Sequence, residues 1–133
     1  MKIPELLKRN RPMVSFEVFP PKRLPSAMSV NPEEIKAMFD TKDVVRRIAA
    51  AKPSFISVTH GAAGGSTGAN TSAIADFVQR ECNVPALAHL TCITSSREKI
   101  ADEIRDLREK GIENILCLRG DFPPNAPRNE SPD

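Results

Sequence analysis

Four short apolar segments, separated by longer stretches with helical spacing, limit most strongly what this chain can fold into. The segments cover residues 13–19, 55–60, 86–92 and 114–119. Segments of this length are typical of buried strands. Strands that alternate with helices form parallel sheets with right-handed crossovers. The sequence therefore predicts an α/β fold, which is either a doubly wound sheet or part of a (β/α)8 barrel.

Helix signals lie between the segments. Asn31, followed by proline, is typical of an N-cap before the first helical position, and a second helical stretch is expected over residues 41–51. Residues 71–80 carry apolar side chains on one helical face. The Ser-Ser-Arg-Glu sequence at residues 95–98 is a capping box, and it predicts a helix that Gly111 ends.

The composition is that of an ordinary soluble protein. Nineteen basic and 17 acidic residues give a net charge of +2, which offers no electrostatic case for nucleic acid or membrane binding. No apolar run approaches the roughly 20 residues that span a bilayer, so a cytoplasmic protein is expected.

The isolated cysteines 82, 92 and 117 form no Cys-x-x-Cys pair and are expected to be reduced, mostly buried thiols. Residues 1–121 are expected to fold, and the proline-rich, polar residues 122–133 to be loop or disordered.

Polar residues gather at the carboxyl ends of the four segments, where α/β sheets and barrels build their sites. They are Glu17, Thr59, His89, Arg119 and Asp121. Burying unpaired charges costs several kcal/mol, so stability alone would not select this convergence. Strand alternation also predicts a purely apolar face on each segment, suited to covering helices. In the fourth segment that face is assigned to Leu116 and Leu118.

Each of these residues has a structural alternative. Glu17 is interpreted either as a proton donor with a raised pKa or as one partner of a buried ion pair with Arg119 or another base. His89, on an apolar run, is more typical of a core residue, and His60 fits a turn or a ligand contact equally well. The two histidines lie on neighbouring segments, but no nearby carboxylate completes a metal site, so no metal is expected.

Two glycine-containing segments have weaker signals. Residues 61–70 follow a strand and precede a helix, as a phosphate-binding loop does, but they match neither the P-loop nor the dinucleotide-binding motif. Arg119-Gly120-Asp121 is either a plain turn or a clamp for a polar heterocycle, because glycine permits a close backbone approach.

Four motifs together resemble the signatures of the methylenetetrahydrofolate reductase family, in the same order and at the same spacing. They are SFEVFPPK at residues 15–22, FISVTHGA at 55–62, AHLTC at 88–92 and NILCLRGD at 114–121. The resemblance implies the first half, about four βα units, of a TIM-type (β/α)8 barrel with FAD at the strand ends. It further implies that NADH or NADPH provides the electrons that reduce 5,10-methylenetetrahydrofolate to 5-methyltetrahydrofolate.

The resemblance also implies roles for individual residues. Glu17 matches the acid that protonates the nitrogen released when the folate's five-membered ring opens, and Asp121 matches an aspartate close to the flavin and the pterin. The positions that match cofactor contacts are Thr59, His60, Ala62, His89, Arg119, Gly120 and Asp121. Many relatives carry tyrosine where this chain has His60.

The catalytic barrels of the family are about twice the length of this chain. The missing strands are expected either in a further half of the barrel or in another copy of this chain. In the second case the chain forms a homo-oligomer. Two alternatives are a catalytically silent half-barrel that oligomerises and an unrelated α/β module that binds a phosphate ester.

Overall fold

The computed structural model of this chain describes residues 1–9, 11–21, 31–60, 68–93 and 95–121. The predictions for Ala62, for residues 61–67 of the glycine-rich segment and for the 122–133 tail lie outside the described residues. Within the described residues, no helix combines the length and the apolar character needed to cross a membrane.

The four predicted strands are all present and form one parallel sheet in the order β1-β2-β3-β4. They are β1 (Ser15–Val18), β2 (Phe55–Val58), β3 (Ala86–Thr91) and β4 (Asn114–Leu118). Each strand is shorter than its apolar segment, because the last one or two residues of each segment, and the first two of residues 13–19, have no regular secondary structure. The sequential order and the parallel pairing confirm the α/β class.

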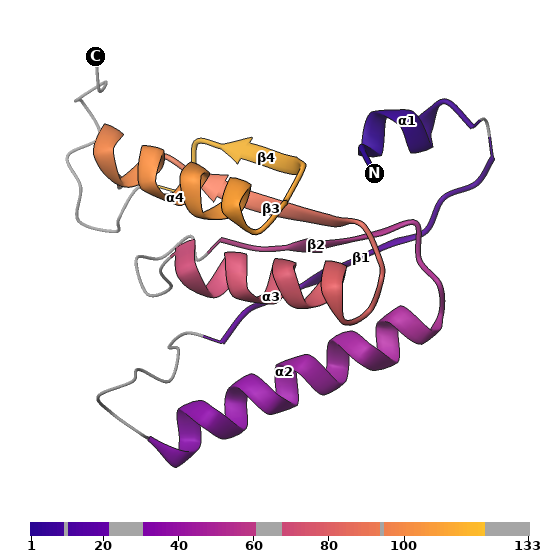
Figure 1. The fold of residues 1–133 in the computed structure, drawn as a ribbon, viewed down its shortest axis with the longest axis horizontal. Helices are drawn as coiled ribbons and strands as arrows, with labels where there is room; N and C mark the ends of the chain where they lie inside the picture. Colours follow the sequence, from indigo (N-terminus) through magenta and orange to yellow (C-terminus); the bar gives the residue numbers. More distant parts are fainter. Residues whose placement is uncertain (10, 22–30, 61–67, 94, 122–133) are drawn as a thin grey trace.

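The helices are α1 (Ile3–Leu7), α2 (Pro32–Ala50), α3 (Gly68–Arg80) and α4 (Arg97–Glu109). Figure 1 shows α2, α3 and α4 together on one side of the sheet, whereas α1 lies apart at one end of the strands. A doubly wound sheet carries helices on both faces, so the one-sided arrangement of α2, α3 and α4 is consistent with part of an α/β barrel.

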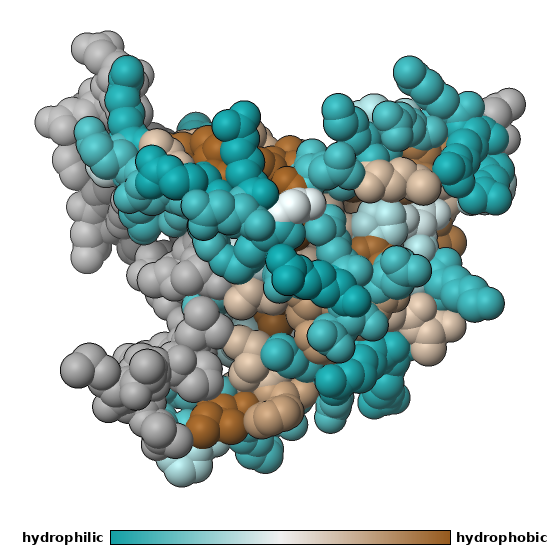
Figure 2. Space-filling model, viewed as in Figure 1, coloured by the Kyte–Doolittle hydropathy of each residue, from teal (hydrophilic) through white to brown (hydrophobic). Residues whose placement is uncertain are grey.

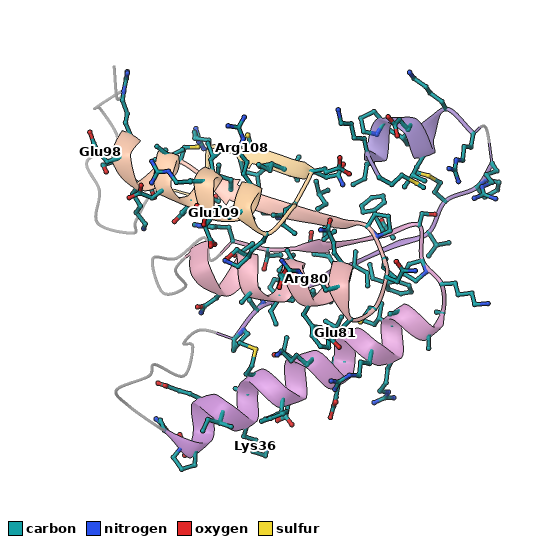
Figure 3. All side chains as sticks on the ribbon, viewed as in Figure 1. Lys36, Arg80, Glu81, Glu98, Arg108 and Glu109 are labelled. Carbon is teal, nitrogen blue, oxygen red and sulfur yellow. The ribbon has the colours of Figure 1, made fainter. Side chains whose placement is uncertain are left out.

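A single apolar core joins the sheet to these three helices. The side chains of Ile56, Val58 and Ala88 on the strands are fully buried against Val45 of α2 and Ile74 of α3. The outer surfaces of the helices are hydrophilic (Figure 2), apart from apolar side chains over the first part of α2 and beside α4. Figure 3 labels exposed charged residues of these outer surfaces. They are Lys36, Arg80, Glu81, Glu98, Arg108 and Glu109.

Residues 32–50 form one continuous helix. The prediction of a second, separate helical stretch over residues 41–51 therefore placed the start of this helix too late. Asn31 does cap the helix: its Oδ1 accepts a hydrogen bond of 3.0 Å from the Glu33 amide. Polar residues between the two predicted stretches lie on the outer face of the same helix, where they leave the buried stripe unbroken.

The N-cap of α4 is Ser96, whose Oγ accepts from the Lys99 amide at 3.2 Å. A capping box between Ser95 and Glu98 requires Ser95 as the N-cap, so the helix starts one residue later than predicted. Gly111 ends the helix as predicted, with a positive φ of 70°.

The face assignment in β4 is wrong. Leu116 lies in register with His89 and Leu118 with Thr91, so both leucines are on the polar face of the sheet. They remain 39% and 38% exposed there, and Ile115 lies on the face that packs against the core instead. Residues on both faces of β4 are apolar, so alternation alone could not decide its orientation.

The prediction that the cysteines are mostly buried is also wrong. All three are free thiols, but Cys82 and Cys92 are half-buried and Cys117 is exposed on the edge strand β4. Burial raises the pKa of the Cys82 thiol, and the charge of Arg46 opposes this effect.

Asn114 ties α1 to the amino-terminal end of the sheet. Its Oδ1 accepts from the Ile3 amide at 2.9 Å, and its Nδ2 donates to the carbonyls of Met1 and Ala86 at 3.1 Å each. The α-amino group of Met1 also lies 2.7 Å from Glu113 Oε2. One buried amide thus joins the first residues of the chain to β3 and β4.

Candidate functional site

A pocket of about 460 Å³ opens at the carboxyl end of the sheet. It is lined by Glu17, Phe19, Thr59, His60, His89, Thr91, Leu118, Arg119, Gly120 and Asp121. Every residue that the sequence predicted for the site and that the structure describes is among them. They come together because all four parallel strands end at this edge.

Glu17 lies near His89 on the open face of the sheet. Its Oε2 atom is 3.7 Å from His89 Nε2 and 3.5 Å from the hydroxyl of Ser57 on the neighbouring strand. The base that lies beside Glu17 is therefore His89. The Glu17 side chain is 50% exposed, because β1 is an edge strand. The deep burial expected of a proton donor is not provided by the described residues.

The pKa of His89 lies below its usual value. Burial of the ring is the main cause, the carboxylate of Glu17 acts in the opposite direction, and the nearby His60 lowers the pKa further. A lowered pKa favours the neutral imidazole near neutral pH, and a neutral imidazole has one donor and one acceptor for a ligand.

His60 is held from both sides. Its Nδ1 atom lies 2.6 Å from the Thr91 hydroxyl, and its Nε2 atom lies 3.2 Å from Oε2 of Glu103 on α4. The side chains of His60 and Glu103 are only 5% and 11% exposed. The second contact has the distance of an ion pair but not the angle of a hydrogen bond, so its attraction is electrostatic and not a directed bond.

The turn after β4 is fixed by backbone hydrogen bonds. The Ile93 amide donates to the Arg119 carbonyl at 2.9 Å, and Gly120 adopts a positive φ of 86°. A Cβ atom on Gly120 would lie 3.1 Å from a methyl group of Ile93 and 3.3 Å from Thr91. Glycine is therefore required here both by the backbone angle and by the space.

The first turn of α3 holds the strand ends from the other side. Buried Asn70 donates from Nδ2 to the Pro21 carbonyl at 2.6 Å, and Thr71 donates from its hydroxyl to the Thr59 carbonyl at 3.0 Å. These bonds fix the backbone that follows β1 and β2, and with it the pocket residues Phe19 and Thr59.

The lining suits a planar heterocycle with a polar edge. Phe19 and Leu118 provide apolar surface, and Thr59, His89 and Arg119 provide hydrogen-bonding groups. Among the residues that the structure describes, no three His, Cys, Asp or Glu side chains are close enough together to hold a metal ion.

Sequence reasoning did not identify Ser57, Thr91 and Glu103 as part of this arrangement. Thr91 shares the face of His89 by strand alternation, which is a usable signal. The sequence contains a clearer signal for Glu103. This residue lies between Ile100 and Leu107 at helical spacing, so an acidic residue interrupts the buried stripe of α4.

Members of one protein family are similar to this chain. The sequence profile of the family described as methylenetetrahydrofolate reductase matches residues 2–133. A protein of Oryza sativa named probable methylenetetrahydrofolate reductase (NADH) is 38% identical over 122 residues, which are 92% of this chain and 18% of that protein. The 5,10-methylenetetrahydrofolate reductases of Pectobacterium carotovorum and Salmonella typhimurium are 36% and 35% identical over 86% and 88% of this chain. The chain spans 35% and 36% of the length of these two bacterial proteins.

Proposed function

Because this chain belongs to the methylenetetrahydrofolate reductase family, we propose that its pocket is part of a site that reduces 5,10-methylenetetrahydrofolate to 5-methyltetrahydrofolate. The observation that carries the proposal is the convergence of Glu17, His89, Arg119 and Asp121 on one pocket at the carboxyl end of the strands. A carboxyl group, an imidazole and a guanidinium around one heterocycle-sized space suit proton transfer beside a polar ring.

The residues present fit the ring system of FAD. Thr59, His89 and Arg119 would bind its polar edge, and the backbone at Gly120 would allow it to approach closely. His60 would line the adjacent wall, and Ala62 matches a further contact but lies outside the described residues. When bound, FAD would supply the hydride that is taken from the nicotinamide cofactor and given to the folate.

Glu17 is proposed as the acid. Opening the five-membered ring of the folate leaves electrons on a nitrogen, and a carboxyl proton delivered to that nitrogen completes the bond cleavage. Half of the Glu17 side chain is exposed to the open face of the sheet, so it is accessible to a substrate bound there. Asp121 is proposed to stabilise a cationic folate species through its negative charge.

A reduced nicotinamide is proposed as the electron donor. The names of the rice and maize relatives specify NADH, which favours NADH over NADPH for this chain as well. A cytoplasmic location is proposed with it, since that is the default for a chain of this composition.

The site is proposed to need further strands. The edges of β1 and β4 have no partner strand in the described residues, and Leu116 and Leu118 are exposed on the open face. Unpaired parallel edges and exposed apolar side chains favour association. We propose that residues 1–121 form half of a (β/α)8 barrel, which is closed by further strands of the same protein or by another copy in a homo-oligomer.

The first test is the visible absorption spectrum of the chain after incubation with FAD and removal of free flavin. A retained, shifted flavin spectrum supports the proposed cofactor site, and a colourless protein contradicts flavin binding by these four strands alone. In flavin-containing protein, Glu17→Gln is expected to lower folate reduction by about 10²- to 10⁴-fold and to leave reduction of the flavin by NADH within a few-fold. Exposed Glu109→Gln is the matched control. An equal loss in both half-reactions would show that Glu17 is not the acid.

A further inference from the structure

Glu103 has a carboxylate whose two oxygens are buried. It occupies the apolar stripe of α4, between Ile100 and Leu107, and only 11% of its side chain is exposed. Removing a carboxylate from water is unfavourable unless hydrogen bonds or a cation compensate. Neither of its oxygens has a hydrogen-bond partner among the described residues. Its one charged or titratable contact in that part of the chain is the ring of His60.

His60 is correspondingly constrained. One ring nitrogen faces Thr91 at 2.6 Å and the other faces Glu103 at 3.2 Å, so both nitrogens are turned toward protein groups. The ring still lines the pocket. With its nitrogens directed to β3 and α4, the ring contributes carbon edges and faces, rather than a hydrogen bond, to whatever the pocket binds.

The charge of Glu103 also decides which nitrogen carries the proton. An ionised carboxylate only accepts, so a lone pair on Nε2 would be repelled by it, whereas an Nε2–H group is attracted. Nδ1 then accepts from the Thr91 hydroxyl when the ring is neutral, which agrees with their separation of 2.6 Å. With Nε2 protonated, His60 accepts a hydrogen bond from Thr91 and places an N–H group, which the Glu103 charge attracts, 3.2 Å from Oε2.

We propose that Glu103 is a positioning residue, which holds His60 with Nε2 protonated and directed to α4, so that the ring presents its carbon surface to a planar ligand in the pocket. The identity of that ligand as FAD rests on the function proposed above. The arrangement of Thr91, His60 and Glu103 does not depend on the ligand, so the two statements can be tested separately.

The direct test is the ring ¹⁵N spectrum of the chain without flavin. The chain has two histidines, so the variant His89→Gln assigns the remaining signals to His60. At about pH 8, above the ordinary titration range of histidine, the unmodified chain is expected to show Nε2 protonated and Nδ1 unprotonated. In Glu103→Leu the signals are expected to shift toward a mixture of both tautomers, and Thr91→Val should shift mainly the Nδ1 signal.

Two further variants make this result decisive. Glu109→Leu introduces the same change at an exposed position of α4 and should leave the His60 spectrum unchanged. Glu103→Gln retains the size of the side chain, removes its charge and replaces one acceptor oxygen by an NH2 donor, so it serves if Glu103→Leu does not fold. The inference is overturned if the unmodified chain carries its proton on Nδ1, or if the spectrum of a folded Glu103 variant matches that of the unmodified chain.

Flavin binding then separates this inference from the proposed function. If FAD binds, Glu103→Leu should weaken it by about 2- to 10-fold, the cost of immobilising one side chain that is no longer held. An unchanged affinity would contradict a positioning role toward the flavin. If the tautomer shifts as expected but neither the unmodified chain nor any variant binds FAD, the arrangement around His60 stands and flavin binding by these four strands alone is contradicted.

Discussion

Replacement of Asn114 by alanine should destabilise the chain strongly without touching the pocket. The Asn114 amide makes three hydrogen bonds, to the backbone of Met1, Ile3 and Ala86, and the residue is 6% exposed. A hydrogen bond of this kind contributes about 0.5–1.5 kcal/mol net, so the three together contribute about 1.5–4.5 kcal/mol. Domains of this size unfold with only about 5–15 kcal/mol, so the loss should be easily measured.

Urea unfolding of Asn114→Ala and the unmodified chain measures this loss directly. Native-state hydrogen exchange locates it: amides of α1 should exchange faster, whereas those of β2 should change only through the global stability. Gln79→Ala is the matched control, because it removes a single exposed hydrogen bond to the Gly111 carbonyl. A destabilisation of less than about 1 kcal/mol, or one no larger than that of the control, would refute the reasoning.

Asn114→Asp tests the polarity of the same contacts. The shape of the side chain is unchanged, but an oxygen replaces the amide that donates to the Met1 and Ala86 carbonyls. The ionised variant should be at least as unstable as Asn114→Ala, and part of the loss should be recovered at acid pH, where the carboxyl group regains a donor. If the Asp variant loses more stability in acid than the unmodified chain does, the assigned donor direction is wrong.

Four further predictions concern the core and the pocket. Ile74→Ala should cost about 2–5 kcal/mol in urea unfolding because Ile74 is fully buried, whereas Val44→Ala, at a 49% exposed site, should cost much less. Gly120→Ala should cost more stability than Gly111→Ala, because both glycines have positive φ but only a Cβ at Gly120 meets neighbours, at 3.1 Å and 3.3 Å; equal losses would mean that the contacts around Gly120 do not matter. Glu17→Gln should lower the pKa of His89 further, measured by NMR titration, because the Glu17 charge raises it in the unmodified chain. The folded state lowers the pKa of His89, so the unfolded chain binds a proton at this residue more readily than the folded chain does. As the pH falls through the ordinary histidine range toward the folded pKa, the unmodified chain should therefore lose stability relative to His89→Gln. A gain of stability relative to that variant over the same range would contradict the sign.

The sheet was predictable because its strands are marked by both length and composition. Each apolar segment coincides with a strand, and the predicted site residues that the structure describes meet at one pocket, because parallel strands bring their carboxyl ends together. β4 shows where this reasoning stops. Apolar residues occupy both faces of this strand. The polar residues Arg119 and Asp121 follow the strand, so their positions do not indicate which of its faces is buried.

The partners of the site residues were less predictable than the residues themselves. Glu17 lies beside His89, and this pairing depends on the register between strands far apart in sequence. The contact between His60 and Glu103 crosses from the end of β2 to the middle of α4, and no local pattern joins them. What the sequence does contain is the anomaly itself, an acidic residue in an apolar stripe.

Because α1 lies at one end of the strands, the two ends of the sheet differ in what a mutation there affects, the stability of the fold or the properties of the pocket. At the amino-terminal end, Asn114 and the first residues of the chain determine how firmly the sheet is held, far along the strands from the pocket. At the carboxyl end, the same strands present the side chains of the pocket. Protein engineering can use this separation: stabilising substitutions around α1 could be selected first, and the stability gained there would then permit destabilising changes at the pocket when its ligand preference is altered.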